Sequence, residues 1–136
     1  MDEWKNFLNE GKQFLQATTG KNGNPSKLSN DIRYNLLALS VEKSMMALLL
    51  FNHDMADNHT FSDLLHSVSG YVMIPGTIQD ELRELEKTQT ICNVYEYHRA
   101  IPTDQEVTRL TIVAEYLFEL ATRTCTDAAV DTATGS

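Results

Sequence analysis

The chain has 136 residues, of which 42% are hydrophobic and 22% are charged, and its formal net charge is −8. This length is typical of one domain, and such a domain buries about two-thirds of the surface that its unfolded chain exposes, so a core can form without disulfides or metal. The composition, with six glycines and three prolines, excludes a collagen-like or low-complexity chain. Residues 60–136 hold twelve acidic and five basic side chains, a net charge of −7, which argues against a broad basic surface for nucleic acid.

The sequence favours a cytoplasmic protein without a membrane span. Its longest unbroken apolar run, residues 45–51, is far shorter than the roughly 20 residues that a membrane-spanning helix needs. The first residues, Met1 to Trp4, are acidic and polar and lack the order of a secretory signal. Cys92 and Cys125 lie far apart in helix-like sequence, and we expect buried apolar thiols rather than a disulfide.

Two helices are predicted in the first half of the chain. Residues 2–18 carry apolar side chains at the spacing of an amphipathic helix, and residues 20–26 concentrate turn formers that predict a loop. A long helix is then expected from about Ser29, with Asn30 and Asp31 offering capping oxygens and early negative charge. Apolar residues cover so much of its circumference, from Tyr34 to Leu50, that this helix must pack on more than one side.

Three more helices are predicted in the second half. Thr60 caps a short helix, the next begins at Thr77 and ends near residue 97, and a capping box, in which Thr103 and Glu106 cap each other's amides, begins the last one. Residues 126–136 lack an apolar repeat. We therefore expect one helical domain over residues 1–125 and a flexible C-terminal tail over residues 126–136.

No segment alternates apolar and polar residues as a strand would. The predicted fold class is all-α: an antiparallel up-and-down four-helix bundle with a short extra helix in one connection, within residues 59–71.

Three segments match the motifs of a known family. The family's second helix typically carries a small residue, Glu and Lys, followed by an Ala-Leu-Leu run. This chain has the same pattern at Ser40, Glu42, Lys43 and residues 47–49. Residues 59–64, His-Thr-Phe-Ser-Asp-Leu, match the start of the next helical segment except for its second His, and residues 97–99 correspond loosely to an Arg-Tyr-Pro-like turn before the last helix. In this order the motifs resemble those of the HEPN domain, the nucleotide-binding domain named for higher eukaryotes and prokaryotes, over residues 1–124.

This resemblance implies a four-helix bundle, commonly a homodimer, that binds a nucleotide or works beside a nucleotidyltransferase-like partner without catalysis of its own. The nucleotide-binding residues that we expect are Lys43, His59, Tyr97, His98 and Arg99. A short RNA is also compatible, whereas duplex DNA and a membrane are not expected as partners. The sequence names no cofactor, and the histidines and aspartates between residues 53 and 66 lack the spacing of a metal site.

Two other functions stay open. Some HEPN proteins are metal-independent ribonucleases, often toxins of toxin–antitoxin pairs, in which a His follows an Arg by four to six residues. No Arg in this chain has such a His, and no nucleophile motif occurs, so no residue is predicted to be catalytic. His98 and Arg99 are adjacent, and as a degenerate ribonuclease site they would converge only with their copies across a symmetric dimer. The third function is a helical module for protein contacts alone.

Overall fold

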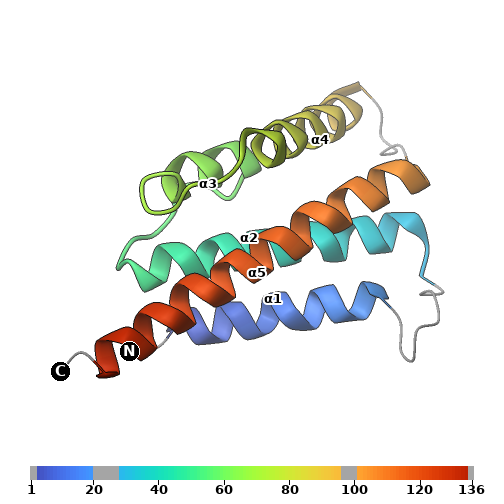
Figure 1. The fold of residues 1–136 in the computed structure, drawn as a ribbon. Helices are drawn as coiled ribbons and strands as arrows, with labels where there is room; N and C mark the ends of the chain where they lie inside the picture. The colour runs from blue at the N-terminus through green and yellow to red at the C-terminus, as the bar shows by residue number, and fades with distance from the viewer. Residues whose placement is uncertain (1–2, 20–27, 96–100, 135–136) are drawn as a thin grey trace.

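The computed structural model describes residues 3–19, 28–95 and 101–134, with the side chains of residues 3–19, 28–87 and 101–126. These residues form five helices: α1 (Glu3–Thr19), α2 (Asn30–Phe51), α3 (Phe61–Val68), α4 (Gly76–Tyr95) and α5 (Asp104–Thr134). No strand occurs in this part of the chain, so the predicted all-α class is confirmed there. Figure 1 shows α2 and α5 side by side through the middle of the molecule, with α1 on one side and α3 and α4 on the other.

Helix α2 is the centre of the fold and packs against α1, α3 and α5. Its buried side chains lie all around its circumference, and Leu37, Val41, Met45 and Leu48 are fully shielded from solvent. This arrangement confirms the prediction that the helix packs on more than one side. Its neighbours therefore supply most of its stability, because packing and not intrinsic propensity dominates for a buried helix.

The same helix is long and apolar enough to cross a membrane, with 22 residues and a mean hydropathy of 1.3. In this structure 56% of its apolar window is buried inside the protein. A helix that is apolar on all sides is expected either in a membrane or in a protein core. Burial against three neighbouring helices accounts for the hydropathy of α2.

Small residues bring α1 and α2 close together. Gly11 is buried at their interface, and the Ser40 hydroxyl donates a hydrogen bond of 2.8 Å to its carbonyl oxygen. A Cβ atom at Gly11 would lie 3.3 Å from the Ser44 Oγ and 3.5 Å from the Lys43 Cβ. A small residue is therefore favoured at this crossing, since a side chain larger than alanine would push against α2.

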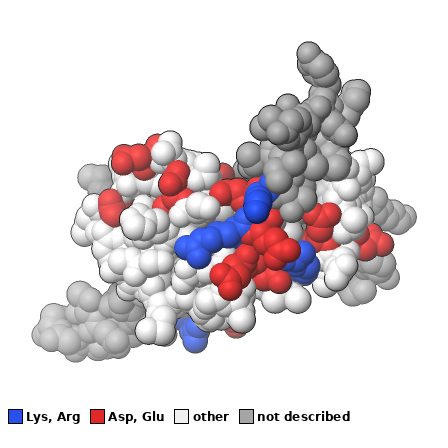
Figure 2. All heavy atoms as spheres, turned by 90° about the horizontal axis from the view of Figure 1, so that it is seen from above, with Lys and Arg blue, Asp and Glu red and all other residues white. Residues whose placement is uncertain are grey.

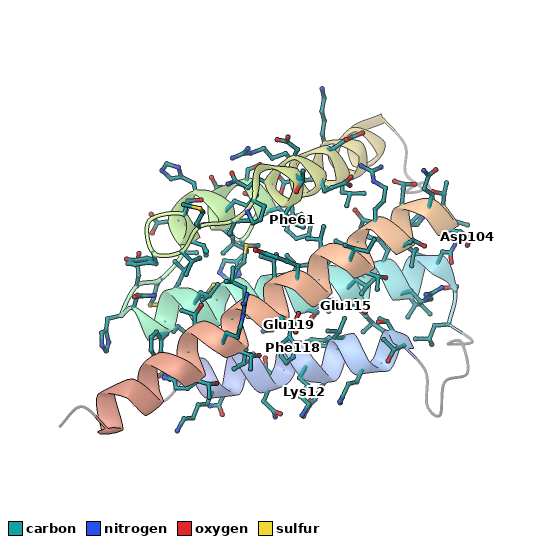
Figure 3. The ribbon with its side chains drawn as sticks, in the orientation of Figure 1. Lys12, Phe61, Asp104, Glu115, Phe118 and Glu119 are labelled. Atoms are coloured by element: carbon teal, nitrogen blue, oxygen red, sulfur yellow. The ribbon has the colours of Figure 1, made fainter. Side chains whose placement is uncertain are left out.

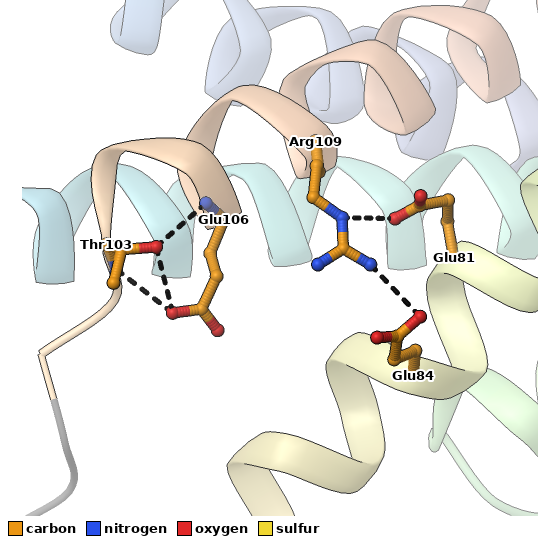
Figure 4. Close-up of polar contacts among 5 residues, drawn as sticks. All are labelled: Glu81, Glu84, Thr103, Glu106 and Arg109. Atoms are coloured by element: carbon orange, nitrogen blue, oxygen red, sulfur yellow. Dashed lines mark hydrogen bonds and ion pairs between the residues drawn. The ribbon is translucent and has the colours of Figure 1, made fainter.

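The predicted caps of α3 and α5 are present. The Thr60 hydroxyl accepts a hydrogen bond of 3.2 Å from the Asp63 amide. Thr103 and Glu106 form the predicted capping box, in which each backbone N–H donates to the other residue's side chain at 3.1 Å (Figure 4). These bonds satisfy amides that have no partner within their own helix.

The start of α2 differs from the prediction. Its cap is Ser29, whose hydroxyl accepts a hydrogen bond of 3.3 Å from the Ile32 amide. Asn30 instead donates from its amide group to the Pro102 carbonyl at 3.1 Å and to the Asp104 carboxylate at 2.7 Å. Asn30, one of the two side chains predicted to cap α2, therefore ties the start of α2 to the start of α5.

The C-terminal end of α2 is closed by an unusual residue. His53 has a φ of 60°, a left-handed conformation that glycine adopts more easily. Its amide donates to the Leu50 carbonyl at 3.0 Å, and the Asp54 amide donates to the Leu49 carbonyl at 2.8 Å. These two bonds stop the helix and turn the chain toward α3.

A carboxylate from α4 holds the start of α3. Glu86 accepts hydrogen bonds from the Phe61 backbone amide and, at 2.8 Å, from the Ser62 hydroxyl. A carboxylate at a helix N-terminus satisfies free amides and opposes the positive end of the helix dipole. Glu86 thus joins α3 to α4 by charge as well as by packing.

Helix α5 continues to Thr134, beyond the predicted domain boundary at residue 125. The helix therefore extends into the segment for which a flexible tail is predicted. Its motion is a separate property, and the flexibility of residues 126–136 stays a prediction.

Candidate functional site

Lys43 lies between α1 and α2. Its ammonium group is 3.2 Å from a carboxylate oxygen of Glu10 and 4.9 Å from the centre of the Phe7 ring. Its side chain is 24% exposed, so the aliphatic part is largely packed. The ion pair and the ring both stabilise the cation, and a phosphate at this position would have to compete with Glu10.

His59 precedes α3 and pairs with Glu42 on α2. The Nδ1 atom of His59 lies 2.5 Å from a carboxylate oxygen of Glu42, and the two side chains are 52% and 24% exposed. In the sequence, Glu42 precedes Met45 and Met46 by three and four residues, a helical spacing that predicts a partly buried carboxylate in need of a polar partner. The structure confirms this prediction. His59 is that partner, which gives the residue a structural role beside any role in binding.

The structure describes two of the five predicted nucleotide-binding residues, Lys43 and His59. Tyr97, His98 and Arg99 lie outside the described residues. Lys43 faces Glu10 on α1, whereas the neighbouring Glu42 faces His59. Consecutive helical residues point about 100° apart, so Lys43 and His59 lie on different sides of α2 and are paired with separate carboxylates.

A groove of about 300 Å³ lies on the other side of α1, between α1 and α5. Its lining comes from four residues of α1 and two of α5: Lys5, Leu8, Asn9, Lys12, Phe118 and Thr122. Figure 3 labels Lys12 and Phe118 on these two helices. None of the six residues is among the predicted site residues, because the groove exists only where α5 packs beside α1.

The lining combines positive charge, an aromatic ring and neutral polar groups. Lys12 is exposed and has no ion-pair partner among the described residues. The Lys5 ammonium lies 5.5 Å from the centre of the Trp4 ring. Asn9 and Thr122 add an amide and a hydroxyl beside the Phe118 ring. Such a set suits a ligand that has both an anionic group and a flat apolar part.

The face of the molecule over α3 and α4 carries both acidic and basic side chains (Figure 2). Between α4 and α5, Arg109 donates to Glu81 at 2.6 Å and to Glu84 at 3.2 Å (Figure 4). The hydrogen bond to Glu81 raises the pKa of Arg109 above its ordinary value. This guanidinium holds two helices together and is a poor candidate for binding a phosphate.

The loops at the two ends of α3 meet through one hydrogen bond. The Tyr71 hydroxyl donates to the Asp54 carboxylate at 2.6 Å. This bond, with a smaller effect of the Met55 amide, lowers the pKa of Asp54, and the same bond raises the pKa of Tyr71. The contact therefore stabilises the fold above the ordinary pKa of Asp54 and is lost as the pH falls through its lowered value. At alkaline pH it is lost again when Tyr71 ionises.

Replacing Tyr71 with Phe is expected to raise the pKa of Asp54 toward its ordinary value of 3.8, because the phenol no longer stabilises the carboxylate. The Met55 amide remains as a donor, so the return is incomplete. A carboxyl-carbon NMR titration measures the change, and Tyr116→Phe on α5 is the control. An Asp54 pKa that is equal in the wild type and in Tyr71→Phe would contradict the assignment.

The described residues hold no group of three or more His, Cys, Asp or Glu side chains placed to bind a metal ion. Cys125 is a free thiol, and burial raises its pKa to about 11. A thiol with this pKa is protonated at neutral pH and unreactive, which confirms the expectation for Cys125. The side chain of Cys92 lies outside the described residues.

The chain matches no protein-family model, no curated protein and no solved structure.

Proposed function

We propose that this protein is a HEPN-like nucleotide-binding domain without catalysis of its own. The groove between α1 and α5 carries this proposal, because its lining places Lys5 and Lys12 beside the ring of Phe118. Lysine ammonium groups bind phosphate as point charges, and nucleobases stack on aromatic rings. The Asn9 amide can donate and accept hydrogen bonds with a base edge or a ribose hydroxyl. The Thr122 hydroxyl donates to the Phe118 carbonyl at 2.8 Å and remains available to the ligand as an acceptor.

The net charge of −8 does not oppose a local site of this kind. Affinity for long nucleic acids depends on many phosphate contacts, whereas one nucleotide needs only a few aimed cations. Among the described residues, no carboxylate lines the groove. The protein therefore suits a small anionic ligand better than an extended strand.

The proposal includes the assembly that the resemblance implies and the cytoplasmic location that the sequence favours. The four long helices form an antiparallel up-and-down bundle, with α3 as the extra helix in one connection. The bundle works as a homodimer in the cytoplasm, alone or beside a nucleotidyltransferase-like partner. Support for the bundle comes from the packing of α1 on α2, of α2 on α5 and of α5 on α4.

The five residues named by the resemblance are a second place where the nucleotide would bind. Lys43 and His59 are each paired with a carboxylate, whereas Lys12 in the groove is exposed and has no ion-pair partner among the described residues. Variants of the groove lysines and variants of Lys43 and His59 therefore show at which of the two places the nucleotide binds.

The test is a thermal-shift screen of the full chain against ATP, GTP, CTP, UTP and a short RNA, each with and without Mg²⁺. A ligand at 100 times its dissociation constant stabilises the fold by about 2.7 kcal/mol, so we expect a clear rise in Tm for at least one nucleotide. The RNA is expected to stay intact on a gel.

Charge-neutralising variants locate the site. Replacing both Lys5 and Lys12 with Gln is expected to abolish the shift, whereas Lys87→Gln on α4 is expected to keep it. Loss of the shift in Lys43→Gln or His59→Gln, with an unchanged Lys5/Lys12 double variant, would move the site to the residues of the resemblance. If no nucleotide raises the Tm, the proposal fails and a module for protein contacts becomes the better description.

A further inference from the structure

We infer that the groove between α1 and α5 prefers a nucleoside with a phosphate on each side of its sugar, that is, a 3′,5′-bisphosphate. This inference rests on the proposed function and specifies the ligand class of the same site. It follows from the positions of the two lysines along α1.

Lys5 and Lys12 lie at opposite ends of the α1 wall of the groove. Seven residues separate them, which is two helical turns and about 10 Å along the helix axis. Both line the groove and both are exposed. A nucleoside triphosphate gathers its charge at one end, so one lysine would bind it and the other would stay unused. Phosphates at the 3′ and 5′ positions carry charge to both ends of the ligand.

The wall between the lysines suits the uncharged part of the same ligand. Leu8 and Asn9 lie between them in α1, and Phe118 and Thr122 face the groove from α5. A base can stack on the Phe118 ring, while the Asn9 amide reads a base edge or a sugar hydroxyl. A volume of about 300 Å³ is at the lower end for small-molecule sites, which favours one nucleotide over a longer ligand.

A base flanked by two phosphates also occurs inside an RNA strand, and charge near the groove favours the free nucleotide. Glu115 lies three residues before Phe118, on the same side of α5, and Glu119 follows Phe118 (Figure 3). Both carboxylates are exposed. Further phosphates of a strand that continued along α5 would meet these carboxylates, which are not among the residues that line the groove itself.

The test is calorimetric titration of the full chain with the 5′-monophosphates and the 3′,5′-bisphosphates of adenosine, guanosine, cytidine and uridine. For at least one base we expect the bisphosphate to bind ten times or more tightly than the monophosphate. Lys5→Gln and Lys12→Gln, each alone, should remove most of this preference, and Lys87→Gln should leave it unchanged. Circular dichroism verifies that each variant is folded.

The outcomes separate this inference from the proposed function. Equal affinity for monophosphate and bisphosphate, or a nucleoside triphosphate that binds while no bisphosphate does, would overturn the inference and leave nucleotide binding intact. Absence of binding by every nucleotide would overturn both. Trinucleotides of the same bases form the last arm, and tighter binding of a trinucleotide than of its bisphosphate would overturn the assignment to a free nucleotide.

Discussion

Replacing Leu48 with Ala is expected to lower the free energy of unfolding by about 2 to 5 kcal/mol. Leu48 is fully buried in the middle of α2, the helix that packs against α1, α3 and α5. The change removes buried apolar atoms and leaves a cavity that surrounding helices fill only in part. A domain of this kind is stable by about 5 to 15 kcal/mol, so the loss is a large share of the total. Urea unfolding followed by circular dichroism measures it.

The control for this variant is Leu39→Ala, on the same helix. Leu39 is 37% exposed, so truncation removes less buried surface and leaves no closed cavity. We expect a loss of less than about 1 kcal/mol, because alanine also has the higher helix propensity. Equal losses for the two variants would show that α2 is not buried on the side of Leu48.

Apolar spacing and capping residues predicted most of the fold. The number and order of the helices, the caps at Thr60 and Thr103 and the burial of α2 all agree with the structure. These features depend on local sequence, which is why a single chain reveals them. The extension of α5 to Thr134 was not predicted, since residues 126–134 lack the apolar repeat that marks a packed helix.

The ends of α2 show where local reasoning fails. Asn30 has the right chemistry for a cap, yet it binds Pro102 and Asp104 and leaves the capping to Ser29. Its partners lie more than 70 residues away in the chain, so only the folded structure reveals them. At the other end, His53 adopts the left-handed conformation that a glycine would have signalled.

The same limit applies to the candidate sites. The partial burial of Glu42 could be predicted from its place beside the apolar side of α2, and it implied a partner without identifying His59. The groove could not be predicted, because its lysines and its aromatic ring come from opposite ends of the chain. In the sequence, Lys5 and Lys12 are two ordinary cations of an amphipathic helix. They become a candidate site only beside Phe118.

Replacing Gly11 with Val is expected to destabilise the fold by about 1 to 3 kcal/mol, the usual cost of overpacking a tight interface. A Cβ atom added at this position would lie 3.3 Å from the Ser44 hydroxyl oxygen and 3.5 Å from the Ser40 carbonyl oxygen. The two methyl groups of valine have no room unless α1 moves away from α2. That movement would also strain the hydrogen bond between the Ser40 hydroxyl and the Gly11 carbonyl. Thermal and urea unfolding both report the change.

Two further variants separate crowding from backbone effects. Gly11→Ala gains up to about 1 kcal/mol of helix propensity, which offsets its milder contact with Ser44, so we expect a net change near zero. Gln13→Val places the same branched side chain at an exposed position of α1 and is expected to cost only a few tenths of a kcal/mol, the difference in propensity. If Gly11→Val were no more destabilising than Gln13→Val, the close approach of α1 and α2 would be refuted. A larger loss for Gly11→Val alone would mean that this glycine sets the distance between the helix that carries Lys5 and Lys12 and the central helix of the core.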